Sequence, residues 1–267
     1  MALTSIPTKA LEESGRLLYN RNERDGRTRA IGETIMASDD SYDLLRHTPL
    51  FAGLSDSELA RMASDLHRRC YAGGETIFHQ GDPGNAVYVV ASGRVRIYVP
   101  TEEGQEVSVV FYGPGGMFGE MALVDQKPRS ATAQAMEDTV VWAMNGTHFY
   151  RHLRENYQVA LNLMQLLSRR LRATTDHVRA MASLDVSRRT IQALLDLAHQ
   201  QGRATPEGIR LGRLTQQDLA SLIGTSRESV NRALRALARK GLVAVLQGQI
   251  VVCRPEELTE LLGEESS

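Results

Sequence analysis

The chain has 267 residues, 42% of them hydrophobic and 24% charged, so it is long enough for two domains and has the composition of a soluble globular protein. It has no run of about 18 uncharged apolar residues and does not begin with the order of a signal peptide, which excludes a transmembrane helix and leads us to expect a cytoplasmic protein. The two cysteines, Cys70 and Cys253, are too far apart in sequence to suggest a disulfide framework or a metal cluster, and the net charge of −1 identifies no partner.

Residues 1–38 are polar, mixed in charge and without a sustained period, which predicts a flexible N-terminal arm. The arm contains five arginines between Arg16 and Arg29 that could contact nucleic acid. Because acidic residues interrupt them, we favour a solvated tail. Met36 is a second candidate start of the protein.

Residues 39–155 change from a helical to a strand-like pattern. Short helices are predicted over 44–51 and 56–67. From Gly73-Gly74 to Lys127-Pro128, turn signals then recur about every ten residues and separate short runs rich in valine. Strands at this spacing predict an all-β roll of the jelly-roll type, and with the helices around it the fold class is α+β.

His148 and His152 are four residues apart and would share one face of a short helix after the last strand. That spacing can bind a metal ion, but no third ligand is in view. We therefore favour a structural role and expect no metal.

The segment 118–132 of the predicted roll carries the most specific chemistry. Gly119 permits close approach of the backbone, and the carboxylate of Glu120 can accept hydrogen bonds from a pair of hydroxyls. Arg129 and Ser130 can bind a phosphate diester through charge-assisted hydrogen bonds. These features together suit a nucleotide, whereas a lone glutamate and arginine would more simply form an ion pair beside a turn.

Residues 156–184 form one long amphipathic pattern that predicts a dimerisation helix. Apolar residues recur at alternating steps of four and three, the heptad seam of a two-stranded coiled coil, and a second stripe beside it could pack against the chain's own preceding domain. Thr174 is a polar residue in the seam, which argues for a specific contact there and against a helix buried in a single core. The seam comprises Ala160, Met164, Leu167, Leu171, Thr174, Val178 and Met181, and the second stripe comprises Leu163, Leu166 and Ala173.

Residues 185–267 predict a winged helix-turn-helix domain. An amphipathic helix is expected over 187–200, followed by an exposed loop over 201–208. Near the end of the chain, two strand-like runs flank Gln247-Gly248 and predict a hairpin wing.

The helix-turn-helix itself is predicted from two capping boxes, at 215–218 and 225–228, each of which opens a helix. Between and beyond them, the small residue Ala220, the turn glycine Gly224 and the apolar Val230 stand four and six residues apart. This spacing supplies the close contact, the left-handed turn and the interhelical core of the motif.

The second of these two helices is basic, with five basic residues against one acid between Arg227 and Lys240. Side chains at the start of a recognition helix enter the major groove, where arginine can pair with guanine and glutamate can accept from cytosine. For Glu228 the capping box is a competing role, and for Arg235 and Arg239 phosphate contact or solvation is favoured. The side chains expected to contact DNA are Ser226, Arg227, Glu228, Ser229 and Arg232.

From about residue 44 to 254 the chain resembles the CRP/FNR family of bacterial transcription regulators, close to its cyclic-AMP receptor branch. The resemblance implies a cyclic-nucleotide site in which Glu120 holds the ribose 2′-hydroxyl near the Gly119 backbone, and in which Arg129 and Ser130 hold the cyclic phosphate. It also implies base contacts, one of them across the dimer, and a further basic residue near the ligand. The residues that match these positions are Ile97 and Val109 for the apolar wall, Thr174 and Thr175 for the adenine, and Arg170 near the ligand.

The resemblance further implies a homodimer that reads a TGTGA-like DNA palindrome through Arg227, Glu228 and Arg232, and an RNA polymerase contact by the loop 201–208. Cyclic AMP is the expected ligand. Cyclic GMP, cyclic-di-GMP and constitutive activity stay open, and a haem site using Cys70 and His79 is a remote alternative. A nucleotide-binding module for a partner enzyme is disfavoured by the winged helix in the same chain, and no constellation of residues predicts an enzyme.

Overall fold

The computed structural model describes residues 18–19, 30–31, 39–104, 106–212, 214–246 and 249–263. Of the predicted N-terminal arm, residues 1–38, it describes a two-stranded antiparallel pair of β1 (Leu18–Tyr19) and β2 (Ala30–Ile31), and the rest of the arm lies outside the described residues.

The β-roll, β3 to β10, consists of two four-stranded antiparallel sheets with the strand orders β3-β10-β5-β8 and β4-β9-β6-β7. This confirms the predicted all-β roll. The elements of the roll, with the helices before and after it, are α1 (Asp39–His47), η1 (Pro49–Phe51), α2 (Asp56–Ala63), β3 (Leu66–Tyr71), β4 (Thr76–Phe78), β5 (Ala86–Ser92), β6 (Val95–Pro100), β7 (Glu106–Tyr112), β8 (Met117–Phe118), α3 (Met121–Val124), β9 (Thr132–Ala135), β10 (Thr139–Asn145) and α4 (Gly146–Glu155). The helix predicted over 56–67 ends at Ala63, because β3 begins at Leu66 and pairs with β10.

The central strand β5 is buried on both faces and divides the core of the roll. Val87 and Val89 face a cluster formed with the surrounding helices, whereas Tyr88 and Val90 face a second cluster with Phe118 of β8. This alternation follows from the period of two along a strand. The short continuous apolar run in the sequence is therefore a strand covered on both sides.

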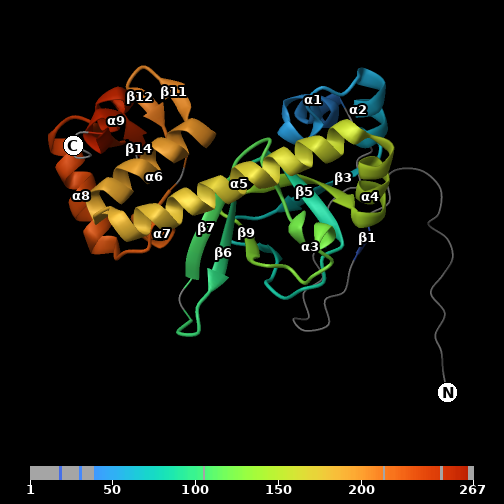
Figure 1. Cartoon of the computed structure of the whole chain (residues 1–267), viewed down its shortest axis with the longest axis horizontal. Coiled ribbons are helices and arrows are strands. Elements are labelled where there is room, and N and C mark those ends of the chain that lie inside the picture. The colour runs from blue at the N-terminus through green and yellow to red at the C-terminus, as the bar shows by residue number, and fades with distance from the viewer. Residues whose placement is uncertain are drawn as a thin grey trace.

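The long helix α5 (Tyr157–Ser183) crosses from the β-roll to the C-terminal domain (Figure 1). Asn162 anchors its first half, because the side-chain amide donates to the carbonyls of Leu50 and Ala52 at 2.9 Å each. The second stripe is confirmed at Leu163 and Leu166, which pack in the cluster formed by Val87, Val89 and the surrounding helices. The predicted stripe is wrong at Ala173, which is exposed. No described residue of α5 after Leu163 is buried.

The reader domain, α6 to α9, has the predicted helix-turn-helix and wing. Its elements are α6 (Val186–Gln201), β11 (Arg203–Thr205), β12 (Gly208–Arg210), α7 (Gln216–Ile223), α8 (Arg227–Arg239), β13 (Val243–Leu246), β14 (Gln249–Val252) and α9 (Pro255–Gly263). The loop expected over 201–208 instead contains the hairpin β11–β12, and the predicted wing turn Gln247-Gly248 lies outside the described residues. The acidic C-terminal segment forms α9, which packs on α6.

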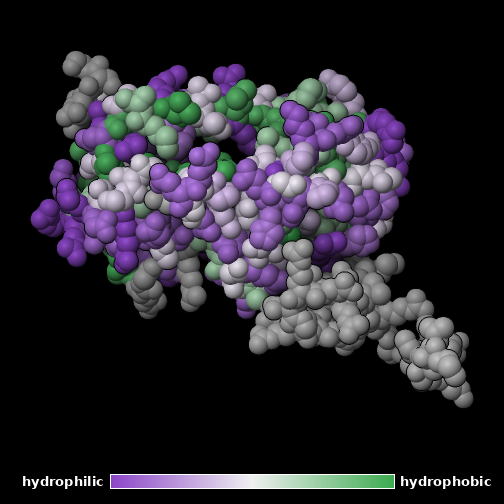
Figure 2. Space-filling view, turned by 90° about the horizontal axis from the view of Figure 1, so that it is seen from below, coloured by the Kyte–Doolittle hydropathy of each residue, from purple (hydrophilic) through white to green (hydrophobic). Residues whose placement is uncertain are grey.

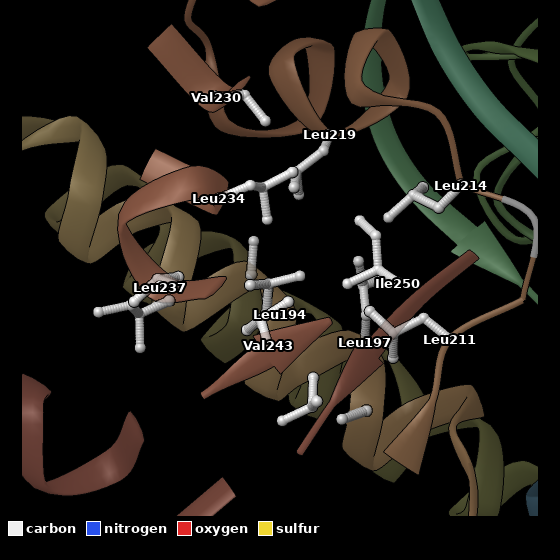
Figure 3. Close-up of a cluster of buried hydrophobic side chains, with 14 of the residues drawn as sticks. Leu194, Leu197, Leu211, Leu214, Leu219, Val230, Leu234, Leu237, Val243 and Ile250 are labelled. Carbon is white, nitrogen blue, oxygen red and sulfur yellow. The ribbon is translucent and has the colours of Figure 1, made fainter. Parts of the chain in front are cut away.

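The motif residues behave as predicted inside this domain. Ala220 and Val230 are fully buried, and Gly224 ends α7 in the left-handed conformation with φ 64°. Figure 3 shows the core they share, with Leu219, Val230 and Leu234 directed toward Leu194 of α6. The capping box predicted at Thr215 is confirmed.

The second predicted capping box, at 225–228, is wrong. Helix α8 begins one residue later, because Ser226 rather than Thr225 is the cap and its hydroxyl accepts from the amide of Ser229 at 3.3 Å. The amide of Thr225 is instead bonded to the carbonyl of Ala220, which closes the turn.

Candidate functional site

Gly119 lies between β8 and α3 in a backbone conformation that only glycine adopts without strain, with φ +82°. A Cβ atom there would lie 2.8 Å from Nη1 of Arg129 and 3.2 Å from the ring of Tyr88. The glycine therefore lets the backbone approach the arginine closely, as the motif predicts.

Arg129 is buried, at 4% exposure, and is held by main-chain groups rather than by an acid. Nη1 donates to the carbonyl of Gly119 at 2.6 Å and Nη2 to that of Ala86 at 2.9 Å. Cζ lies 4.2 Å from the ring centre of Phe78, a cation–π contact. Burial lowers the pKa of Arg129 below its ordinary value, but the group remains a cation, and its buried Nε has no hydrogen-bond partner among the described residues.

Glu120 is almost completely buried, at 1% exposure, and pairs with a residue of α5. Its Oε1 forms an ion pair with Nη1 of Arg170, while its buried Oε2 has no hydrogen-bond partner among the described residues. Arg170 also donates to the carbonyl of Met117 and lies over the ring of Tyr112, 5.0 Å from its centre. Burial raises the pKa of Tyr112 to about 12, so this phenol is neutral at pH 7.

The structure thus brings Arg170 of α5 to the segment that carries Gly119, Glu120 and Arg129, 50 positions after Glu120 in the sequence. They form a cluster with two cations, of which Arg129 is buried and Arg170 is half-buried, one buried carboxylate and two hydrogen-bonding atoms without a partner among the described residues, Glu120 Oε2 and Arg129 Nε. A buried polar atom without a partner costs about 1–3 kcal/mol, so both atoms favour a ligand with complementary groups. A hydroxyl can donate to the carboxylate, and an anionic oxygen can accept from the guanidinium.

Other expected ligand residues lie near this cluster but point elsewhere. Ser130 is exposed, and its hydroxyl contacts the sulfur of Met121 at 3.7 Å. Thr174 and Thr175 lie one turn of α5 beyond Arg170 and are exposed, with their hydroxyls bonded to carbonyls four residues earlier in the helix at 2.9 Å.

The two residues expected to form an apolar wall differ in their surroundings. Ile97 is half-buried beside the cluster that contains Tyr88 and Phe118. Val109 is 53% exposed, at an irregularity in the pairing of β6 and β7. The residue opposite Ile97 on β7 is Val110. The sequence predicts neither this register nor the aromatic contacts of Arg129 and Arg170, since Phe78, Tyr88 and Tyr112 read only as strand residues.

The candidate DNA-contacting surface is the exposed face of α8. Its buried face consists of Val230, Ala233, Leu234 and Leu237, so Arg227, Glu228 and Arg232 are turned to solvent. Ser226 and Ser229 are bonded to one another at 3.1 Å and form the helix cap, which gives both hydroxyls a structural role. Figure 2 shows hydrophilic side chains at the reader-domain end of the molecule, as well as over the roll.

His148 and His152 share a helix face as predicted, and both contact one carboxylate. Nδ1 of His148 lies 3.1 Å from Asp65, and Nε2 of His152 lies 2.7 Å from it. Arg151 forms an ion pair with the same carboxylate. Within the described part of the chain, no three His, Cys, Asp or Glu residues are grouped so that they could hold a metal ion.

Cys70 and His79 lie in or next to different sheets, Cys70 in β3 and His79 directly after β4. Arg68 donates to the Cys70 sulfur at 3.1 Å. Among the described helices, none is both long and apolar enough to cross a membrane.

Two protein families match consecutive parts of the chain. The cyclic nucleotide-binding domain matches residues 68–156, which include Glu120 and Arg129, and the Crp-like helix-turn-helix domain matches residues 188–261, which include α7 and α8. The two matches correspond to the β-roll and to the reader domain.

Relatives of known name are similar over most of their length. The chain is 40% identical over 220 residues to the cyclic AMP receptor protein of Thermus thermophilus, a match that covers 81% of this chain and 98% of that protein. It is 30% identical over 216 residues to the CRP-like cAMP-activated global transcriptional regulator of Mycobacterium tuberculosis, covering 80% of this chain and 96% of that one.

Solved structures with a similar fold include one that is named for a different nucleotide. The c-di-GMP-responsive global regulator CLP of Xanthomonas campestris has a TM-score of 0.63 at 27% identity, covering 74% of this chain and 99% of its own. FixK2 of Bradyrhizobium japonicum has a TM-score of 0.66 at 25% identity, covering 73% of this chain and 96% of its own.

Proposed function

Since this chain belongs to the CRP/FNR family of cyclic-nucleotide-binding transcription regulators, we propose that it is a cyclic-AMP-responsive, sequence-specific DNA-binding regulator that acts as a homodimer. The observation that carries the proposal is the cluster of Glu120, Arg129 and Arg170, in which α5 contacts the segment of the predicted nucleotide motif. We propose the domain boundaries 39–155, 156–184 and 185–267 for the roll, the dimerisation helix and the DNA-binding domain.

In the proposed complex, the cyclic phosphate is bound by Arg129 and Ser130, and the ribose 2′-hydroxyl donates to Glu120 near Gly119. The buried, unpaired oxygen of Glu120 and the buried Nε of Arg129 support these two contacts. The base lies between Ile97 and Val109 on one side and the α5 hydroxyls on the other, where Thr174 and Thr175 bind the adenine. Arg170 orients Glu120 through their ion pair.

Cyclic AMP is favoured over other cyclic nucleotides because the two relatives compared above are named for it. Cyclic GMP and cyclic-di-GMP are competing ligands, since the phosphate contact does not distinguish bases and one solved regulator of this fold is named for c-di-GMP. A regulator that is active without any of them is the remaining alternative.

The homodimer is supported by the exposed apolar seam of α5. Leu171 is 68% exposed and Val178 is 60% exposed, although both occupy the seam of the heptad pattern. A second copy of α5 would cover these side chains and place the partner's Thr174 or Thr175 beside the ligand.

DNA recognition is assigned to Arg227, Glu228 and Arg232, which we propose contact the bases of a TGTGA-like palindrome, with Ser226 and Ser229 at the helix cap beside the phosphates. The exposed turn of the β11–β12 hairpin, within the segment 201–208, is the proposed contact for RNA polymerase.

Coupling follows from the position of Arg170 on the dimerisation helix. A ligand that binds one arrangement of the paired helices more tightly shifts the population toward it. That arrangement would set the two recognition helices about one DNA turn apart, roughly 34 Å.

The decisive experiment is calorimetric titration of the purified protein with cyclic AMP, cyclic GMP and cyclic-di-GMP, each with and without a TGTGA-palindrome duplex. We expect cyclic AMP to bind most tightly and to raise operator affinity. If another nucleotide bound more tightly, that nucleotide would be assigned as the ligand in place of cyclic AMP. An operator affinity unchanged by bound cyclic AMP would contradict the coupling but would leave the assignments of both binding sites in place.

A further inference from the structure

The cluster of Glu120, Arg129 and Arg170 is called the ligand cluster below. Strand β7 contacts this cluster with one residue and the reader domain with the next. The ring of Tyr112 lies under Arg170, the partner of Glu120. Its neighbour Phe111 is 3% exposed and belongs to the buried core of the reader domain, together with Leu194 and Leu219. Successive side chains of a strand point to opposite faces, so one strand contacts both sites.

Ser221 of α7 is bonded to the main chain of this strand. Its hydroxyl donates to the carbonyl of Glu106 at 2.5 Å and accepts from the amide of Ser108 at 2.8 Å. Strand β7 is the edge of its sheet, so within the described part of the chain these main-chain groups have no neighbouring strand on that side. One hydroxyl therefore satisfies a donor and an acceptor that would otherwise need water.

Two further contacts flank this bond. The guanidinium of Arg94, in the turn between β5 and β6, lies across Gly212, so closely that a Cβ there would be 1.2 Å from Nη2. On the other side, the end of the Met181 side chain in α5 lies 2.9 Å from the position of a Cβ on Gly224. The roll and α5 thus contact the reader domain at the loop before α7, at α7 and at the turn after it (Figure 1).

These contacts use the elements that a helix-turn-helix places against DNA. In such motifs the first helix crosses the DNA backbone while the second enters the groove. Gly224 is two residues from the cap of α8, and α5, with a diameter of about 10 Å, lies against it through Met181. In this arrangement α5 therefore occupies space beside the turn that precedes the recognition helix.

We propose that the contact between α7 and β7 is a docking interface within one chain that competes with DNA binding, and that β7 links it directly to the ligand cluster. Ser221 and Phe111 are its positioning residues. This inference rests on the proposed function for the identity of ligand and operator, and it adds a second route of coupling to that through α5.

The test is Ser221→Ala in the full-length protein, with Thr259→Ala as the matched control. Thr259 lies on α9 in the same domain, and its hydroxyl is bonded within its own helix to the carbonyl of Pro255. Loss of the two bonds of Ser221 should raise affinity for DNA without ligand by about tenfold, on a TGTGA duplex and on a random duplex alike, because docking obstructs both. The control should change neither.

The same variant should reduce the factor by which cyclic AMP raises operator affinity, since part of the docking that the ligand opposes is already lost. Ser221→Thr keeps the hydroxyl and should restore wild-type values, which a merely structural defect would not. Phe111→Leu, which keeps an apolar side chain, should act in the same direction if Ser221→Ala proves unstable by circular dichroism. Ligand-free DNA affinity that stays at the wild-type value in both variants would overturn the docking interface.

The ligand-free measurement also separates this proposal from the proposed function. If wild-type protein binds no cyclic nucleotide, the ligand assignment fails, but the effect of Ser221→Ala on DNA binding still decides whether the interface exists.

Discussion

Arg170 on the long helix α5 forms an ion pair with Glu120 at the end of strand β8, 50 positions earlier in the chain. The pair joins the predicted dimerisation helix to the predicted nucleotide motif inside one chain. It also leaves one oxygen of a buried carboxylate without a hydrogen-bond partner among the described residues, and in the proposed complex the ribose 2′-hydroxyl donates to this oxygen. The predictions below begin from this pair.

Glu120→Gln should weaken cyclic-AMP binding by about 10- to 100-fold, because a hydrogen bond to a charged group contributes roughly 1.5–3 kcal/mol. The amide keeps the volume of the side chain but removes the charge that pairs with Arg170. Titration calorimetry measures the change. Glu257→Gln is the control, since Glu257 forms an exposed ion pair with Arg254. Equal cyclic-AMP affinities of the two variants would show that Glu120 does not contribute to the binding site.

Gly119→Ala should abolish ligand binding, whereas Gly104→Ala should not. Both glycines have positive φ, +82° and +77°, so both variants should lose about 1–2 kcal/mol of folding free energy. Only at Gly119 would the new methyl group strike Arg129, because no atom of the described residues lies within 4 Å of a Cβ built at Gly104. Urea unfolding and calorimetry separate the two effects, and a loss of binding shared by both variants would point to strain alone.

Leu171→Glu should shift the protein from dimer to monomer by placing a charge in the seam of α5. The side chain is 68% exposed in one chain, so the variant should leave the fold of that chain intact. Sedimentation velocity measures the assembly state. Gln165→Glu adds the same charge at an exposed position of α5 outside the seam and should remain dimeric.

Arg232→Ala should cost about 1–3 kcal/mol of specific DNA binding and relax the preference at one base pair. Arg239→Ala, at the far end of the same helix, should weaken binding to all sequences by a similar factor. Fluorescence anisotropy with single-base variants of the palindrome distinguishes them. If Arg232→Ala also weakens all sequences equally, Arg232 contacts phosphate.

Asp65 should make folding stability depend on pH in the acid range. Burial raises the pKa of Asp65, but hydrogen bonds with His152 and Arg151 together outweigh it, so the pKa lies below the ordinary 3.8. A depressed pKa in the folded state contributes stability that is present above 3.8 and lost as the pH falls through the folded-state value. Thermal unfolding between neutral pH and pH 3 should therefore show a smaller acid loss for Asp65→Asn than for the wild type, and equal losses would contradict this role.

Much of the architecture follows from local patterns. The spacing of Ala220, Gly224 and Val230 predicts the helix-turn-helix because each residue type meets a requirement of backbone or packing within a few residues. Regular turns predict the β-roll for the same reason. The predicted cap of α8, Thr225, is one residue too early. Thr225 and Ser226 both offer a hydroxyl for the cap, and the local sequence does not distinguish between them.

Contacts between distant segments are not encoded in this way. Phe111 has the pattern of a strand residue in the roll, yet it lies in the core of the reader domain. Val110 rather than Val109 lies opposite Ile97, because an irregularity in the pairing of β6 and β7 shifts the register. Arg170 lacks any local signal for Glu120, and only the resemblance to a known family placed it near the ligand.

The two hydrogen bonds from Asn162 to the carbonyls of Leu50 and Ala52 hold the first half of α5 against the roll, so movement of the helix is restricted to its second half. A rotation of the helix by one residue position would break both, so its first half cannot turn without the helices beneath it. Met181 lies 18 residues beyond Leu163, the last buried residue of α5, which is about 27 Å at 1.5 Å per residue. A tilt of about 5° at that point therefore displaces the contact with Gly224 by about 2 Å. Small angular changes near the nucleotide motif become atomic-scale displacements at the turn before the recognition helix.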